Sequence, residues 1–267
     1  SLPLITGGSI AWWALADLLP YTPDTPLYVY VKHKASVNSI AISPDSKYVA
    51  SGSDDTTVRI WDAMTGTDLA VFYGQIPIVA VAWSPDGTQI AIGKKDGVLH
   101  LWDVKKRALL HTTTEQMNEG AIQDIHWSPD GQMFATLNKE GILRIWHQKE
   151  KKELVRLRGW PISEGRAMTW SPNSARLAFV ATHNTVSIWN IQEQRSEEAL
   201  LVTGHLQGIA WAPDGQTLAA CVYDGWVQTW DTSTYQQKSV YRTIFPETSC
   251  LCWSPDSQHL ITSESHQ

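Results

Sequence analysis

Cysteine is scarce in this sequence, and its spacing favours neither a disulfide framework nor a metal site. There are three cysteines among 267 residues, which is an odd number. Cys250 and Cys252 alternate along one predicted strand, so both face the same side as small packing residues, and no further ligand is evident near them. We therefore expect no metal site and no cofactor.

Sequence motifs of the common enzyme classes are also missing. The chain has no glycine-rich phosphate loop, no HExxH sequence and no paired carboxylates beyond the aspartates of turns. Positive charge is in short supply, since the formal net charge is −6. A general nucleic-acid binder carries a basic surface, so we expect no nucleic-acid partner. Because the enzyme motifs are missing, we also expect no catalytic residues.

What the sequence does contain is a repeat with a period of about 42 residues. The triplet Ser-Pro-Asp, or a close variant, begins at Ser43, Ser84, Ser128, Ser171, Ala212 and Ser254. A tryptophan recurs in step with this triplet, at Trp61, Trp102, Trp146, Trp189 and Trp230. Two markers that stay in phase over five periods indicate copies of one structural unit.

Each copy predicts four short antiparallel strands. Apolar and polar residues alternate with a period of two, and turn residues interrupt them every 8 to 12 residues. In the copy that begins at Ser36 the predicted strands are 37–42, 47–52, 57–61 and 68–73. Four strands in about 42 residues make one blade of a β-propeller. The innermost strands of the six copies are predicted at 37–42, 79–83, 122–127, 166–170, 207–211 and 249–253.

Over about residues 27 to 265 the chain resembles the WD40 family. The residues that carry the resemblance are RIWD at 59–62, HLWD at 100–103 and TWD at 229–231, with the degenerate copies RIWH at 144–147 and SIWN at 187–190. The resemblance implies an all-β, WD40-type β-propeller that acts as a rigid interaction platform. We expect six blades of four antiparallel strands, or seven in a longer natural chain. The tryptophans just before the Ser-Pro-Asp turns are expected to pack between blades; they are Trp83, Trp127, Trp170, Trp211 and Trp253.

The resemblance also implies a structural network of a histidine, a strand hydroxyl, a turn acid and the strand tryptophan. The first copy has all four, as His33, Ser51, Asp55 and Trp61. Because a buried indole N–H needs an acceptor, we expect Asp55 to accept a hydrogen bond from Trp61. A serine, a histidine and an aspartate in one network also suggest a catalytic triad, but the hydroxyl lies within a strand and not on a nucleophile elbow, so the structural interpretation is favoured.

The other copies keep the network in part. Ile92, Phe179 and Ala220 stand at the hydroxyl position of the second, fourth and fifth copies, and the third keeps Thr136 but has Glu140 as its acid. The remaining members of the network are Asp96 and Trp102 in the second copy, and His205, Asp224 and Trp230 in the fifth.

Residues 1–26 allow two interpretations, and residues 27–267 form the propeller in both. In the first, 7–13 and 27–32 are the third and fourth strands of the last blade, which removes open sheet edges. In the second, the apolar residues 1–19 are the tail of a membrane span and the proline-rich residues 20–26 are a linker. That arrangement is similar to bacterial proteins in which an anchor precedes WD40 repeats, some with an upstream kinase. The protein is then either cytoplasmic or tethered to a bacterial membrane.

Our leading functional hypothesis is a monomeric, non-enzymatic scaffold or sensor that binds a protein or peptide on the propeller face. Loops on a rigid frame carry recognition, and aromatic and arginine side chains dominate binding energy. The predicted partner-binding residues are Trp160, Arg166, Tyr223, Phe245, Lys95 and Lys139. The alternative is a structural role, in which Trp160 and Phe245, each next to a proline, only pack against residues of their own loops.

Two other functions stay open. A membrane-tethered, kinase-linked signalling module would turn its basic loops toward lipid, and those loops hold Lys105, Lys106, Arg107, Lys149, Lys151 and Lys152. A propeller enzyme is the third hypothesis, since fold alone does not exclude catalysis.

Overall fold

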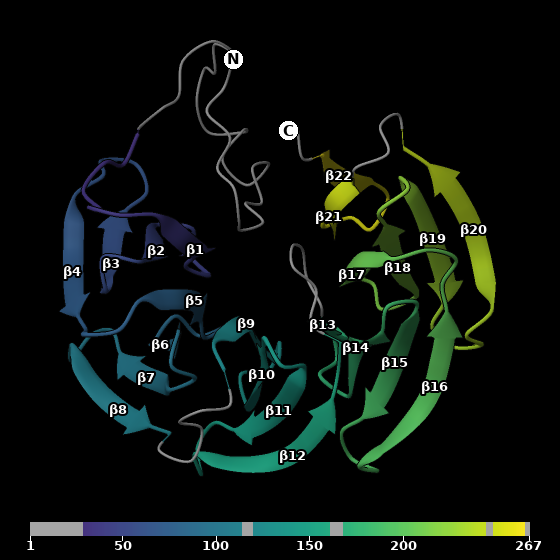
Figure 1. Ribbon diagram of the computed structural model, residues 1–267, viewed down its shortest axis with the longest axis horizontal. Coiled ribbons are helices and arrows are strands. Elements are labelled where there is room, and N and C mark those ends of the chain that lie inside the picture. Colours follow the sequence, from purple (N-terminus) through teal and green to yellow (C-terminus); the bar gives the residue numbers. More distant parts are fainter. Residues whose placement is uncertain (1–28, 114–119, 161–167, 244–247, 265–267) are drawn as a thin grey trace. The chain divides into compact units, whose positions relative to one another are not determined.

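The computed structural model describes residues 29–113, 120–160, 168–243 and 248–264. In these ranges the chain forms β-strands and no helix (Figure 1). Consecutive strands pair into antiparallel sheets, five of four strands and one of two. The fold is therefore all-β and of the WD40 β-propeller type, as the repeat predicts. The predictions for residues 1–28 concern residues outside the described ranges.

The chain divides into two compact units, Ser1–Ile125 and His126–Gln267. The first unit holds two complete sheets. The first sheet consists of β1 (Val37–Ile42), β2 (Tyr48–Ser53), β3 (Thr57–Asp62) and β4 (Asp68–Tyr73). The second sheet consists of β5 (Ile78–Trp83), β6 (Gln89–Lys94), β7 (Leu99–Asp103) and β8 (Ala108–Thr112).

The third sheet begins at the division between the units and consists of β9 (Ile122–Trp127), β10 (Met133–Asn138), β11 (Ile142–His147) and β12 (Lys152–Arg158). The second unit continues with the fourth sheet, β13 (Met168–Trp170), β14 (Arg176–Thr182), β15 (Thr185–Asn190) and β16 (Arg195–Leu201). The fifth sheet follows as β17 (Leu206–Trp211), β18 (Thr217–Val222), β19 (Trp226–Asp231) and β20 (Gln237–Arg242), and the last pair is β21 (Thr248–Trp253) and β22 (Leu260–Glu264).

The Ser-Pro-Asp turn that joins the first two strands of each sheet has a specific chemistry. In the first sheet Ser43 Oγ donates to Asp45 Oδ1 at 2.6 Å and accepts from the backbone N–H of Tyr48 at 2.9 Å. The last residue of this turn has a left-handed backbone, which glycine adopts without strain. It is glycine in three copies, whereas Ser46 takes it with φ of 58° in the first. The turn residues thus help to set the register between the first and second strands of each sheet.

Each strand tryptophan sits at an irregularity between the third and fourth strands. The register shifts between Ile60 and Trp61 in the first sheet and between Thr229 and Trp230 in the fifth, and the other three sheets shift at the same place. Such a β-bulge bends and twists a strand locally. The recurring tryptophan therefore marks a bend in every complete sheet.

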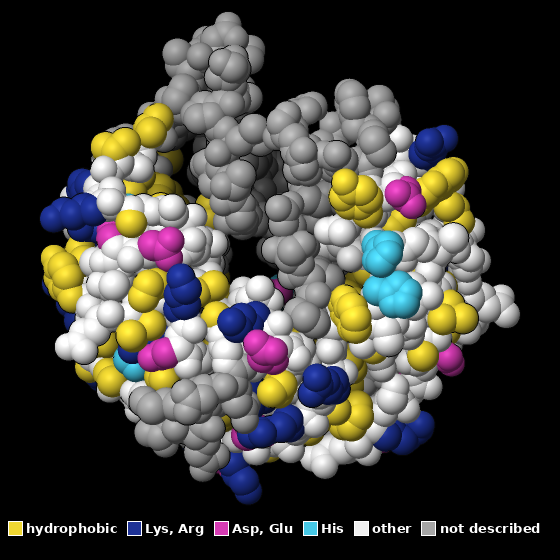
Figure 2. All heavy atoms as spheres, in the orientation of Figure 1, with side chains coloured by type: hydrophobic (Ala, Val, Ile, Leu, Met, Phe, Trp, Pro, Cys, Tyr) yellow, Lys and Arg dark blue, Asp and Glu magenta, His cyan; other side chains and the backbone are white. Residues whose placement is uncertain are grey.

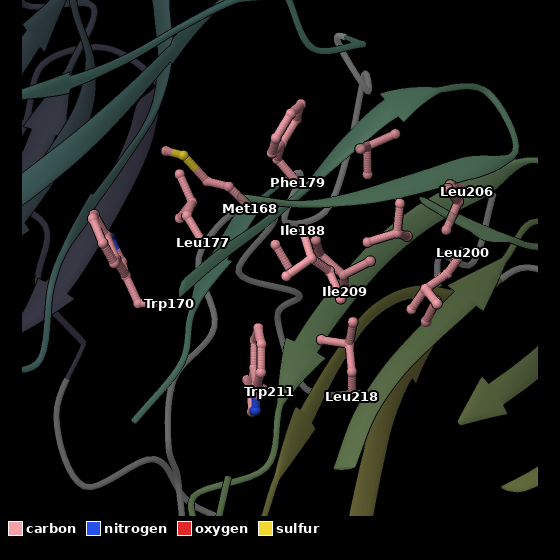
Figure 3. Close-up of a cluster of buried hydrophobic side chains, with 14 of the residues drawn as sticks. Met168, Trp170, Leu177, Phe179, Ile188, Leu200, Leu206, Ile209, Trp211 and Leu218 are labelled. Carbon is pink, nitrogen blue, oxygen red and sulfur yellow. The ribbon is translucent and has the colours of Figure 1, made fainter. Parts of the chain in front are cut away.

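The core lies between consecutive sheets. In the second unit the apolar side chains of the fourth and fifth sheets point toward one another (Figure 3). Met168, Ile188 and Ile209 are fully buried there. Tryptophans before the Ser-Pro-Asp turns add a hydrogen bond between sheets: Trp83 Nε1 donates to the Ala41 carbonyl at 3.1 Å, and Trp253 Nε1 donates to the Ala210 carbonyl at 3.2 Å. These tryptophans pack between sheets, as we expect.

Part of one predicted strand is not assigned as a strand. Residues 29–32, which we expect as part of a fourth strand at 27–32, have no strand assignment. The predicted ladder partner, 7–13, lies outside the described ranges. Tyr30 nevertheless packs as a residue of a fourth strand does. It stacks on Trp61 with ring centroids 4.4 Å apart, and Phe72 of the fourth strand β4 packs on Trp102 at 4.5 Å in the same way. Tyr30 also donates a hydrogen bond to Asp68.

Candidate partner-binding surface

In the first sheet the histidine, the hydroxyl, the acid and the tryptophan form one connected network. His33 Nδ1 lies 2.9 Å from Asp55 Oδ2, and His33 Nε2 lies 2.8 Å from Ser51 Oγ. The indole N–H of Trp61 donates to Ser51 Oγ at 3.2 Å. The acceptor of this indole is therefore Ser51 and not the Asp55 carboxylate that we expected, because the register places Ser51 beside the tryptophan and leaves Asp55 in the turn.

Asp55 organises the turn and the histidine instead. Its carboxylate accepts hydrogen bonds from the backbone N–H groups of Lys34 and Thr57, from the Thr57 hydroxyl and from His33. Burial opposes ionisation of this side chain, but the hydrogen bonds from Thr57, Lys34 and His33 outweigh it and hold the pKa of Asp55 far below its ordinary value. The side chains of His33 and Asp55 are only 4% and 8% exposed. Both residues belong to the structure of the sheet.

The second and third sheets replace parts of the network. In the third, Trp146 Nε1 donates to Thr136 Oγ1 at 3.1 Å, as Trp61 does to Ser51. In the second, Ile92 removes the hydroxyl, and Lys94 Nζ lies 3.0 Å from His100 Nε2. Burial and the neighbouring charge of Lys94 lower the pKa of His100 to about 4, so the imidazole is neutral and accepts from the ammonium group.

In the fourth and fifth sheets the network is open. Phe179 and Ala220 occupy the hydroxyl position, and both are buried. The indole N–H of Trp189 consequently has no hydrogen-bond partner in the part of the chain that the structure describes. His205 and Asp224, which we expect to join Trp230, are both exposed, and no hydrogen bond joins their side chains.

By its backbone hydrogen bond His205 corresponds to Ser36 of the first sheet and not to His33, and its side chain meets a second histidine on the surface. The rings of His183 and His205 lie 5.3 Å apart, and Trp160 contacts His183 edge-on at 6.1 Å. Figure 2 shows two adjacent histidine side chains on this face with hydrophobic side chains beside them. Backbone hydrogen bonds tie the loops together, from Leu206 N–H to the His183 carbonyl and from Tyr223 N–H to the His205 carbonyl, both at 2.9 Å.

Two further exposed aromatic residues, Tyr223 and Trp226, lie in the turn before β19 and at the start of β19. Trp160 is 47% exposed, Tyr223 is 51% exposed, and Trp226, three residues after Tyr223, is 37% exposed. The guanidinium group of Arg242 lies over the ring of Trp226, 5.3 Å from its centroid. We refer to Trp160, His183, His205, Tyr223 and Trp226 as the aromatic–histidine surface. All of it belongs to the second unit.

The predicted partner-binding residues are distributed unevenly. Trp160 and Tyr223 lie on the aromatic–histidine surface. Lys95 and Lys139 are exposed in the turns after β6 and β10, in different units, and Arg166 and Phe245 lie outside the described residues. His183 and Trp226 were not predicted from the sequence. A signal for His183 was available, because it replaces the turn acid of the other copies.

The structure also bears on three other kinds of site. Within the described ranges no three histidine, cysteine or acidic side chains come together as a metal-binding group. In the basic loop between β7 and β8, Arg107 donates to the Leu69 carbonyl at 2.7 Å and Lys106 lies 3.6 Å from Asp103, so part of its charge is engaged within the protein. No helix of membrane-spanning length and hydrophobicity occurs in the described part of the chain.

Two family models match the sequence. Residues 24–62, 66–103 and 108–147 match the model of the WD domain, G-beta repeat. Residues 137–267 match the model of the eukaryotic translation initiation factor eIF2A. The first half of the chain thus contains three WD40 repeats, and the second half is similar to an eIF2A domain.

Several characterised proteins are similar to this chain over parts of their length. Periodic tryptophan protein 2 of Arabidopsis thaliana is 26% identical over 221 residues, which is 82% of this chain and 25% of that protein. The ribosome biogenesis protein BOP1 homolog of Monosiga brevicollis is 48% identical over 50 residues, 19% of this chain and 6% of that protein. Protein HIR1 of Kluyveromyces lactis is 35% identical over 83 residues, 26% of this chain and 10% of that protein.

This chain therefore spans a quarter or less of the length of these three relatives. All three come from eukaryotes. They give no support to the bacterial, kinase-linked and membrane-anchored arrangement that the sequence left open as an alternative.

Proposed function

Because the chain contains WD40 repeats and has the fold of a WD40-type β-propeller, we propose that it is a non-enzymatic scaffold that binds a protein or peptide through the aromatic–histidine surface. The observation that carries the proposal is the exposure of Trp160 and Tyr223 beside two histidines whose imidazoles make no hydrogen bond to the residues that the structure describes. Tryptophan and tyrosine supply large contact areas at small cost in side-chain entropy, and they dominate binding hot spots.

The rigidity of the surface supports the same function. Its loops are joined to one another by backbone hydrogen bonds, so little conformational entropy is lost when a partner binds. The alternative that Trp160 packs its own loop has less support, since nearly half of its side chain stays exposed while its edge contacts His183 from another loop.

A peptide library displayed on phage tests the proposal directly, because the selection needs no chosen partner. Peptides selected on the wild-type protein are measured against Trp160→Ala and Tyr223→Ala by biolayer interferometry. We expect each variant to weaken binding about tenfold or more, the effect of losing a hot-spot aromatic. Tyr73→Ala is the matched control, because Tyr73 is an exposed aromatic residue (78%) in the first unit. Selected peptides that bind both variants as tightly as wild type would exclude the aromatic–histidine surface.

Ribosome-associated proteins are the first natural partners to test. Two of the matches, the ribosome biogenesis protein BOP1 homolog and the translation initiation factor eIF2A, have names that concern ribosomes or translation, and these names describe those proteins. Binding of a purified ribosome-associated protein that is lost in Trp160→Ala and retained in Tyr73→Ala would assign this class of partner.

A further inference from the structure

His183 and His205 are two exposed histidines that take no part in the hydrogen-bond network of a sheet. His183 stands at the turn position where the other four complete copies have an acid, and His205 stands directly before β17. Both side chains are exposed, and neither imidazole makes a hydrogen bond within the described ranges. Their nitrogen lone pairs are therefore available to a ligand.

The positions of the two rings are set by their surroundings. The backbone N–H of Leu206, which follows His205, donates to the carbonyl of His183 at 2.9 Å. This bond joins the turn between β14 and β15 to the loop before β17. Trp160 adds an edge-on contact to the His183 ring. Two ligands held on joined backbone segments need little reorganisation to bind one ion.

The distance between the rings fits a shared metal ion. A zinc–imidazole bond is about 2.0–2.1 Å long, which places the metal about 3.2 Å from the centroid of each ring. With a tetrahedral angle at the metal, the two centroids are then about 5.2 Å apart. The observed separation of the His183 and His205 centroids is 5.3 Å.

We propose that His183 and His205 bind one divalent transition-metal ion of the zinc, nickel and copper class. Imidazole nitrogen suits these ions, whereas magnesium and calcium need sets of oxygen ligands. Since no third histidine, cysteine or acidic side chain joins the pair among the described residues, the remaining coordination positions are open to water or to a donor from a partner. The site does not rest on the proposed scaffold function, because binding of the ion needs no partner.

Calorimetry with zinc chloride on tag-free protein tests the site. We expect saturable binding to one site on the wild-type protein, and His183→Ala and His205→Ala should each weaken it about tenfold or more because one of two ligands is lost. His259→Ala is the matched control, since the His259 side chain is 76% exposed and lies away from this pair in sequence and sheet. It should bind zinc as the wild type does.

A second measurement separates loss of a ligand from loss of folding. Substoichiometric copper(II) should broaden the ring resonances of His183 and His205 in the wild-type NMR spectrum before those of His33 or His259. Absence of saturable zinc binding, wild-type affinity in both variants, or broadening that begins at other histidines would each overturn the site.

Discussion

His33 before the first sheet and His205 before the fifth are assigned to equivalent networks by the sequence, but they differ in place and environment. The side chain of His33 is 4% exposed and bonds both Asp55 and Ser51. His205 is exposed and lies beside His183. Tyr223 N–H donates to the His205 carbonyl as Asp54 N–H donates to the Ser36 carbonyl, so the backbone register makes His205 the counterpart of Ser36 and not of His33.

Two differences account for this in physical terms. Three residues separate His33 from β1, and the imidazole of His33 reaches Ser51 and Asp55, so both of its nitrogens find partners. His205 directly precedes β17, and the fifth sheet has Ala220 in place of the hydroxyl. A buried imidazole there would lack a partner, and an unsatisfied polar group costs about 1–3 kcal/mol. His205 therefore lies at the surface, while the sheet itself persists.

The largest expected effect compares the turn acids. Asp55→Ala removes an acceptor of four hydrogen bonds and leaves His33 without its partner, so we expect a loss of about 3 kcal/mol in unfolding free energy measured in urea. Asp96→Ala should cost about 1 kcal/mol or less, because the Asp96 carboxylate accepts only from Val98 N–H within the described residues. Asp224→Ala should stay within about 0.5 kcal/mol of wild type. Equal losses in the three variants would contradict the comparison.

The pH dependence of stability should report on the contact between the fourth and fifth sheets. Glu197 of β16 accepts from Asn190 and Arg176 of its own sheet and from Tyr235 of the fifth, at 2.5, 2.6 and 2.7 Å. Burial opposes its ionisation, but hydrogen bonds from Asn190, Tyr235 and Arg176 outweigh it and lower the pKa of Glu197 to about 2.

Since the pKa of Glu197 is lower in the folded state, its contribution to stability is present above the unfolded pKa and is lost as pH falls from about 5 to 2. Glu197→Gln should flatten this part of the stability curve, followed by tryptophan fluorescence during urea unfolding. If the unfolding free energy of Glu197→Gln falls between about pH 5 and 2 as much as that of the wild type, the contacts of Glu197 between the two sheets do not stabilise the protein.

A smaller effect concerns the strand tryptophans. Trp61→Phe removes the hydrogen bond to Ser51, whereas Trp189→Phe removes none, because the Trp189 N–H has no partner among described residues. Both changes delete similar volumes, and phenylalanine keeps an aromatic ring that can stack on Tyr30 as Trp61 does. We expect Trp61→Phe to cost about 1 kcal/mol more than Trp189→Phe in urea unfolding. The opposite order would show that the network does not stabilise the first sheet.

The smallest effect is a gain. Ser46 and Ser257 hold the left-handed position of equivalent turns, with φ of 58° and 59°. Ser46→Gly should stabilise the protein by about 0.5–1 kcal/mol, since glycine takes this conformation without strain. Ser257→Gly should gain less, because Ser257 Oγ accepts from the backbone N–H of Asp214 at 3.0 Å. Thermal unfolding of both variants measures the difference.

The strands and the open copies of the network could be predicted from the sequence, because strand alternation and turn residues are local signals. Residues 37–42 and 122–127 are strands with the predicted bounds. The acceptor of Trp61 could not be assigned, because it depends on the register between β2 and β3. The pair His183–His205 was missed because the two residues are 22 positions apart and meet only through the contact between loops. The hydrogen bond from Tyr235 to Glu197 could not be predicted for the same reason.

Chemical modification of the histidines tests the central claim most directly. Diethyl pyrocarbonate reacts with accessible imidazole nitrogens, and mass spectrometry of the digested protein reports the rate for each histidine. The network should protect His33, while His205 and His183 should react about tenfold faster or more, as expected of groups that need no local unfolding to react. Equal rates for His33 and His205 would contradict the claim that the network holds His33 inside the first sheet while His205 lies on the surface.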